Sequence, residues 1–257
     1  MIVREENDRF VCIEQNHHAH LAKEMMMKWK LAYLSEDPLA DSVLYAIEQH
    51  DVGWDYFDKQ PFWNDKLKRP YTFIDLPLLI KTIVYTRGVN IISERDPYAA
   101  SLSSAHYSIF LEKYSEEAIR QYIMKEKLRR QQILTSYPEI NDEKFQYHLA
   151  LLQLADNLSL FICLHDPHSP ESRHRYFEKG IAIPKPIDFK HKQFIQPNWI
   201  DERTVELENI TYVSPFNIHL REKYVLKETI NKDGWMAAYE NTRSQKREIE
   251  ISVKKSF

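Results

Sequence analysis

The heptapeptide Gln49–Asp55, QHDVGWD, decides how the rest of this 257-residue chain is interpreted. It ends an apolar helical pattern, and Gly53 stands where a helix would stop. Neighbouring side chains on a regular helix point about 100° apart, so His50 and Asp51 could not share a target within one. Where the backbone leaves the helix, both side chains can turn toward one point. An imidazole and a carboxylate that converge in this way form half of a metal site.

Two further segments supply the other half of the predicted site. Residues 17–22 read HHAHLA and open an apolar helical pattern that begins with His17. Residues 153–159 read QLADNLS, an apolar helix that carries one acid, Asp156. Ligands that come from separate packed helices are typical of metal sites in helical bundles. The sequence therefore predicts a metal site formed by His17, His50, Asp51 and Asp156.

These motifs resemble those of the HD-domain superfamily of metal-dependent phosphohydrolases. The matching runs are HxxxLA at His17, HDVG at His50 and ADNLS around Asp156, and the HDVGW run is similar to that of a bacterial branch of the superfamily. The resemblance covers residues 12–165. It implies a mainly α fold, an HD-like helical bundle, and a divalent cation that activates water for attack on a phosphoester.

The donor set and its neighbours define which ions and ligands are expected. Two imidazoles and two carboxylates suit Mn, Fe, Co, Ni or Zn better than a metal that demands thiolates. One ion is expected, and the resemblance implies room for a second ion, or for a substrate phosphate, at His106. His18 and His20 crowd His17. Either could replace it as a ligand if the helical register differs, and His20 lies near enough to the same face to reach the substrate or the other ligands.

Asp55 is the candidate general base for a metal-activated water. It matches the second acid of the Glu-Asp pair that hydrolases of alarmone nucleotides carry after their His-Asp, whereas Trp54 replaces the first acid and would stand beside the substrate. The cyclic-dinucleotide branch does not match either, because Trp54 occupies the place of its lysine. Arg69 and the RHR run at 173–175 are candidates for phosphate binding, with ordinary surface charge as the alternative.

The expected function is hydrolysis of a phosphomonoester or phosphodiester of a small molecule, such as a nucleotide. Two alternatives stay open. A mixed-valence di-iron oxygenase on the HD scaffold would need two further histidines between Asp51 and Asp156, where His106 and His148 are available. A non-catalytic HD-like binding module would hold a structural metal or none.

Cap and proline signals predict where several helices begin. Asp96-Pro97 and Asn141-Asp142 each place a capping side chain before a helical pattern, and Leu76-Pro77 opens another helix in which Gly88 is a candidate break. The helix that starts after Asn141 carries both His148 and Asp156. The predicted body of the protein is therefore mainly α.

Strand signals lie at both ends of the chain. Residues 1–14 predict a hairpin, and residues 180–257 predict a small antiparallel sheet with a turn at Asp233-Gly234. A sheet of so few strands is only marginally stable by itself, so we expect this strand-rich section to pack on a helical metal-binding domain of residues 15–165. The two parts could form two units or one continuous domain.

Composition excludes several function classes. A net charge of −3 gives no reason to expect nucleic acid as a partner, and the absence of a run of about 18 apolar residues predicts no membrane span. Two cysteines make no disulfide framework, which favours a cytoplasmic protein, and a homodimer stays open. Only four glycines are present, so no dinucleotide fingerprint, phosphate-binding loop or nucleophile elbow can be written.

Overall fold

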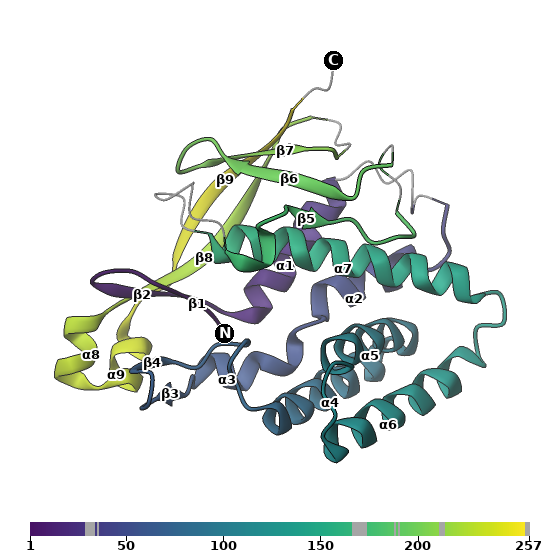
Figure 1. The fold of residues 1–257 in the computed structure, drawn as a ribbon, viewed down its shortest axis with the longest axis horizontal. Coiled ribbons are helices and arrows are strands. Elements are labelled where there is room, and N and C mark those ends of the chain that lie inside the picture. The colour runs from purple at the N-terminus through teal and green to yellow at the C-terminus, as the bar shows by residue number, and fades with distance from the viewer. Residues whose placement is uncertain are drawn as a thin grey trace.

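A computed structural model describes residues 1–28, 34, 36–165, 174–187, 189, 191–210 and 214–254. Its largest feature is a curled seven-stranded sheet with the strand order β1-β2-β8-β9-β7-β6-β5 (Figure 1). The strands are β1 (Ile2–Glu5), β2 (Arg9–Ile13), β5 (Ile181–Ala182), β6 (Phe194–Trp199), β7 (Thr204–Glu208), β8 (Phe216–Leu226) and β9 (Gln245–Val253).

The helices form the rest of the fold. In the described part of the chain they are α1 (Gln15–Lys28), α2 (Ala40–Gln49), α3 (Asp55–Lys59), α4 (Leu78–Arg95), α5 (Pro97–Leu111), α6 (Glu117–Leu134), α7 (Asp142–Leu164), α8 (Lys227–Asp233) and α9 (Trp235–Asn241), with single 3-10 turns η2 (Val52–Trp54) and η3 (Arg175–Phe177). Helices α1 and α7 lie between the sheet and the outer helices α2, α4, α5 and α6 (Figure 1).

The predicted fold class, a mainly α HD-like bundle with a small antiparallel β section, was wrong. Helices take 52% of the chain and strands 20%, so the fold is mixed in content. The sheet is also mixed in direction, because β7 pairs in parallel with β9. Strands β5 and β6 lie within the predicted strand-rich section, residues 180–257, although no individual strand was predicted there before residue 200. Pro197 nevertheless lies within β6, paired with Leu207.

The residues that mark the starts of helices were predicted more reliably than the fold class. Asp96 accepts a hydrogen bond from Ala99 N at the start of α5, and Asn141 accepts one from Lys144 N at the start of α7, so both predicted caps are confirmed. Gly88 does not break its helix, because α4 runs on to Arg95. The predicted turn at Gly234 is a helix-to-helix joint, where a φ of 82° suits glycine and separates α8 from α9.

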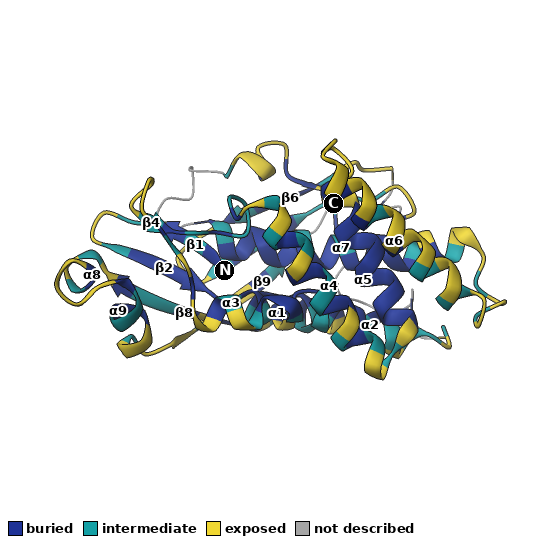
Figure 2. Cartoon of the chain, turned by 90° about the horizontal axis from the view of Figure 1, so that it is seen from below, coloured by how far each residue is buried: buried dark blue, intermediate teal, exposed yellow. Residues whose placement is uncertain are grey.

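One hydrophobic core connects the helices with the sheet. The same cluster of buried side chains contains Leu21 and Leu154 from α1 and α7 together with Ile218 and Ile251 from β8 and β9. Helix α5 is buried along nearly its whole length (Figure 2). Its alanines and serines allow α2, α4, α6 and α7 to approach it closely. The predicted boundary between residues 15–165 and the strand-rich section stays a prediction.

Helix α7 is the most apolar long helix in the fold. By length and composition alone it could cross a membrane, but 78% of its most apolar stretch is buried inside the protein. That burial is typical of the core helix of a soluble protein, with which it is consistent.

A buried ion network connects the sheet with α7. The carboxylate of Glu222 on β8 is 1% exposed and accepts hydrogen bonds from Arg4 Nη2 at 3.1 Å and Arg247 Nε at 3.0 Å. Arg4 also donates through Nη1 to the carbonyl oxygen of Cys163 on α7 at 2.9 Å. Burial alone would raise the pKa of Glu222, but the hydrogen bond from Arg247 and the charge of Arg4 lower it below its ordinary value.

Replacing this acid is expected to destabilise the fold in a pH-dependent way. Glu222→Gln should lower the free energy of unfolding by about 3 kcal/mol at pH 7, because it leaves the buried guanidinium of Arg4 and the half-buried one of Arg247 without their counter-ion. A carboxylate with a depressed pKa contributes stability above its unfolded-state pKa and loses it as the pH falls. The difference between the variant and the wild type should therefore shrink below pH 4.5, the ordinary value for glutamate. Denaturant unfolding at pH 7 and pH 4 measures both effects.

The matched control is Glu250→Gln on β9, which changes an exposed acid of the same sheet. It should leave the free energy of unfolding within about 0.5 kcal/mol of the wild type. An equal loss in both variants would contradict a specific role for the buried network.

Candidate metal centre

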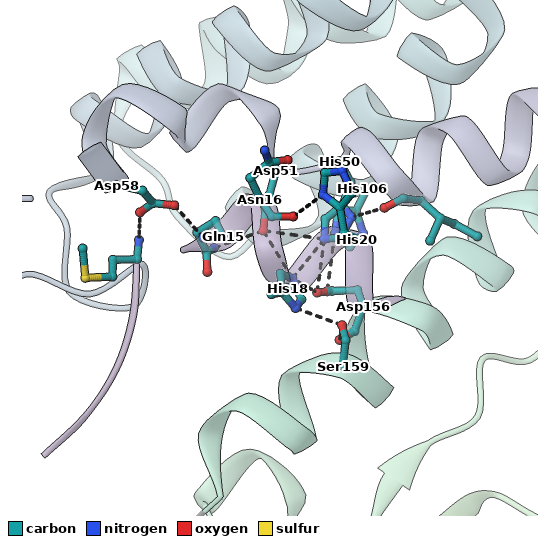
Figure 3. Close-up of polar contacts among 12 residues, drawn as sticks. Gln15, Asn16, His18, His20, His50, Asp51, Asp58, His106, Asp156 and Ser159 are labelled. Atoms are coloured by element: carbon teal, nitrogen blue, oxygen red, sulfur yellow. Dashed lines mark hydrogen bonds and ion pairs between the residues drawn. The ribbon is translucent and has the colours of Figure 1, made fainter. Parts of the chain in front are cut away.

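Buried histidines and aspartates from four parts of the fold meet at one point (Figure 3). The members of this cluster are His18 from α1, His50 and Asp51 from the end of α2, His106 from α5 and Asp156 from α7. Each has an exposed fraction of 6% or less. These groups could hold a metal ion, and they form two overlapping sets, His18-His50-Asp51 and His50-His106-Asp156.

The end of α2 directs two adjacent side chains to the same point. His50 keeps helical dihedrals, whereas Asp51 has a φ of −112° and a ψ of 14°, so the backbone turns out of the helix between them. As a result, His50 Nε2 lies 3.6 Å from Asp51 Oδ2. The sequence QHDVGWD therefore supplies two donors from consecutive residues, which a continuing helix could not do.

The donor atoms are spaced as the ligands of one ion would be. His18 Nε2 lies 3.1 Å from His50 Nε2, 3.3 Å from Asp51 Oδ2 and 3.1 Å from Asp156 Oδ1. His50 Nε2 lies 3.5 Å from Asp156 Oδ1. Atoms that bind one ion at about 2.0–2.2 Å lie about 3.0–3.5 Å from each other. The separations between these atoms fit a cation without rearrangement of the backbone.

Both imidazoles that carry these nitrogens have their other ring nitrogen occupied. His50 Nδ1 lies 2.7 Å from the carbonyl oxygen of Ile47, which can only accept, so Nδ1 carries the proton. His18 Nδ1 lies 2.9 Å from Ser159 Oγ, and that hydroxyl donates to the carbonyl oxygen of Asp156. His18 Nδ1 is therefore also the donor, so on both rings Nε2 is the atom that would present a lone pair once it loses its proton. Metal-binding histidines are typically oriented in this way.

The charges of the cluster are compatible with a bound cation. Burial would lower the pKa of His18, but hydrogen bonds to Asp156 and Asp51 raise it well above its ordinary value. For His50, burial is likewise outweighed, chiefly by the charge of Asp51, and its pKa is raised. Burial would raise the pKa of Asp156, but hydrogen bonds from His18 and His50 lower it. Two buried carboxylates thus hold protons on the histidines, and a metal ion would displace those protons.

His18, not the predicted His17, belongs to the cluster. The buried stripe of α1 contains Gln15, His18, Ala22 and Met25, whereas the side chain of His17 is 26% exposed and its Nε2 lies 3.9 Å from Glu14. One residue rotates the direction of a helical side chain by about 100°, so only one of the two histidines can face α7. The small Ala19 and Ala22 mark the face that packs closely, and this signal favoured His18.

Of the other candidate histidines, His106 lies in the cluster and His20 lies outside it. His106 joins the cluster, with Nε2 3.5 Å from Asp156 Oδ2, and burial lowers its pKa to about 4. Its Nδ1 is buried and has no hydrogen-bond partner among the described residues. The side chain of His20 is 51% exposed and its Nδ1 lies 2.7 Å from the carbonyl oxygen of Asn16, so His20 is not in the cluster.

His148 is held elsewhere in the fold. Its Nδ1 lies 2.7 Å from Tyr98 Oη, and its Nε2 lies 3.1 Å from Asp37 Oδ2. Both ring nitrogens are thus engaged with protein groups outside the cluster.

The remaining candidates divide between the site and the surface. Trp54 is buried and lines the cavity beside the cluster. Asp55 does not line it, since its carboxylate pairs with Lys59 at 2.8 Å in the next helical turn. Arg69 is likewise committed to Asp75 at 2.6 Å. Of the predicted RHR run, Arg173 lies outside the described residues, whereas Arg175 lines the cavity.

A cavity of about 520 Å³ opens from the cluster to the surface. His18, His50, Asp51, His106 and Asp156 form part of its wall. Apolar and aromatic groups make up much of the rest, among them Tyr85 and Phe110. A cavity of this size holds a small molecule, so a ligand could reach the donor atoms.

Sequence reasoning missed two supporting residues. Gln15 donates from Nε2 to Asp51 Oδ2 at 3.0 Å and fixes that carboxylate, while its Oε1 is buried without a partner among the described residues. Ser159 orients His18. Ser159 follows Asp156 by three residues, so a shared helical face was a signal for it. Gln15 had the corresponding signal, three residues before His18.

Comparison with known proteins gives one match. A search of curated proteins found none, and a search of solved structures found none. The family model described as "Protein of unknown function (DUF3891)" matches residues 1–227, which contain every member of the cluster. The chain therefore belongs to the DUF3891 family.

Proposed function

We propose that this protein is a metal-dependent phosphohydrolase that acts on a phosphomonoester or phosphodiester of a small molecule. The observation that supports it best is the convergence of the Nε2 atoms of His18 and His50 with the carboxylates of Asp51 and Asp156. We further propose that the site is of HD type in the order of its ligands, with His18 as the first of them, on a fold that includes a large sheet.

The residues present fit a divalent transition metal such as Mn, Fe, Co, Ni or Zn. When bound, such an ion lowers the pKa of water and neutralises charge on a phosphoryl oxygen. His18, His50, Asp51 and Asp156 would hold it, and His106 would join a second ion if two bind. Gln15 would keep Asp51 oriented through the hydrogen bond from Nε2.

His106 is the candidate for proton transfer in place of Asp55. Burial lowers its pKa to about 4, so the imidazole is neutral at pH 7, and a nearby negative charge would have to raise that pKa for it to act as a base. Nδ1 has no partner among the described residues, and the side chain lines the cavity. Asp55 does not line the cavity and forms an ion pair with Lys59, which leaves it poorly situated for the same task.

A phosphorylated substrate is favoured by the charges of the cavity. Lys81, Lys113 and Arg175 line it, and its acidic lining residues are limited to Asp51 and Asp156 within the described chain. The two carboxylates would be neutralised by the ion, so the remaining field attracts an anion. The di-iron alternative asks for two further histidines, and only His106 lies in the cluster. This difference favours the hydrolase.

Metal content and hydrolysis together test the proposal. The protein, loaded in turn with each candidate ion, should retain about one ion per chain and cleave p-nitrophenyl phosphate or bis(p-nitrophenyl) phosphate. Asp156→Asn should lose the ion and reduce the rate at least ~100-fold. Asp142→Asn changes an exposed acid in the first turn of the same helix and should change neither. Equal metal content in both variants would contradict the proposed site.

A further inference from the structure

Three cations lie around the cavity away from the metal-binding cluster. We call Lys81, Lys113 and Arg175 the rim cations; all three line the cavity. Among the described residues, no carboxylate lies within ion-pair distance of any of them. Cations on protein surfaces are common, but three unpaired ones that share a cavity form a positive end to it.

Lys81 is the most informative of the three. It is 8% exposed, and its Nζ donates to the carbonyl oxygen of Ile74 at 2.9 Å. An ammonium group has three donors, so this bond leaves two of them for other partners. The nearby acid, Asp75, is already bound by Arg69 and by the backbone and hydroxyl of Thr72. A buried lysine normally has a counter-ion, and Lys81 has none among the described residues.

Lys81 lies one helical turn from Tyr85 along α4. Lys81 precedes Tyr85 by four residues on α4, and both line the cavity. The same wall of the cavity contains Trp54, whose ring contacts that of Tyr85 with centroids 6.2 Å apart. Side chains four residues apart on a helix lie about 5–6 Å from each other. Lys81 and Tyr85 therefore lie next to each other on one wall of the cavity.

Helix α5 repeats this arrangement on another wall. His106 belongs to the cluster, Phe110 follows one turn later, and Lys113 lies just beyond the helix end at Leu111. The rings of His106 and Phe110 are in contact, with centroids 4.6 Å apart. The α5 wall thus leads from a donor atom through an aromatic ring to a cation, and the α4 wall carries an aromatic ring beside a cation.

We propose that the rim cations bind a second anionic group of the substrate, separated from the scissile phosphoryl group by an uncharged spacer. This inference rests on the proposed function and specifies its substrate class. The phosphoryl group lies at the cluster, the spacer packs on Tyr85 and Phe110, and the far phosphate or carboxylate accepts hydrogen bonds from Lys81. Hydrogen bonds of this charged kind contribute about tenfold or more to affinity.

Non-hydrolysable ligands of two kinds test the spacing. Butylphosphonate has one anionic end, and butane-1,4-diphosphonate has two ends across the same carbon chain. Calorimetric titration of the metal-loaded protein should give at least ~10-fold tighter binding of the diphosphonate. Lys81→Gln should remove that ratio while keeping the wild-type metal content. Lys113→Gln should reduce it, and because Lys113 is exposed, this variant keeps the test valid if Lys81→Gln misfolds.

The matched control is Lys127→Gln, an exposed lysine on α6 outside the cavity, which should keep the full ratio. A third ligand, 5-phosphonopentanoate, has a carboxylate as its far group. If it gains as much affinity as the diphosphonate, the rim cations accept any anionic group. If it gains none, they select a phosphoryl group. Equal affinity of the wild type for the one-ended and two-ended ligands would overturn the proposal. If the wild type bound no metal but still bound the diphosphonate more tightly through Lys81, only the proposed hydrolase function would be contradicted.

Discussion

His18→Ala is expected to weaken metal binding at least ~100-fold, whereas His17→Ala is expected to bind metal as the wild type does. The two residues are adjacent, but only His18 faces Asp51 and Asp156, at 3.3 and 3.1 Å. Changing the orientation of a ligand through its outer hydrogen bonds typically costs 10–100-fold in metal affinity, so removal of the ligand itself should cost more. Competition with a chromogenic chelator measures both affinities.

The pair of variants controls for general effects of substituting a histidine in the first turns of α1. Thermal unfolding of both apo-proteins should be recorded, because removing a protonated imidazole from the cluster changes the stability of the metal-free fold. The site as described would be wrong if His17→Ala lost the metal and His18→Ala kept it. Ser159→Ala offers a graded check. It removes the hydroxyl that orients His18 and should cost about 10-fold in affinity.

Gly53→Ala is expected to lower the free energy of unfolding by about 3 kcal/mol, the largest effect we predict for a single methyl group. A Cβ atom built on Gly53 would lie 2.2 Å from the carbonyl oxygen of Val84 and 3.0 Å from Gly88 N. Both contacts are backbone atoms of α4, so no side chain can move aside. The turn η2 would have to separate from α4, which would displace Trp54 within the turn and Asp51 just before it.

Gly88→Ala provides the comparison on the facing helix. Its added Cβ would lie 3.1 Å from Tyr107 Oη and 3.2 Å from Gly53 N, which is a tight contact without a severe backbone clash. The loss in Gly88→Ala should therefore be less than half of that in Gly53→Ala. Denaturant unfolding of the two variants and the wild type measures this. Equal losses would show that the close approach at Gly53 does not determine the stability of this contact.

Local features of the fold could be predicted because they depend on neighbouring residues. A capping side chain three residues before an amide, as at Asp96 and Asn141, acts within one turn of helix. The end of α2 at His50 and the turn of the chain at Asp51 depend on the same short range. Strand pairing does not. The neighbours of β8 in the sheet are β2 and β9, and alternation of side chains along β8 cannot specify them.

The sequence by itself predicted that His50 and Asp51, at the end of one helix, and Asp156, on another, are candidate metal ligands, because an imidazole or carboxylate within an apolar helical pattern can be recognised from the sequence. Only the tertiary structure decided that His18 completes the set and that Lys81 belongs to the same cavity. The helix face that is buried depends on where α7 and the sheet lie, and neighbouring residues differ by about 100° in direction. The rotation of α1 about its own axis is fixed by packing between segments far apart in the chain, and the local sequence pattern does not reveal it.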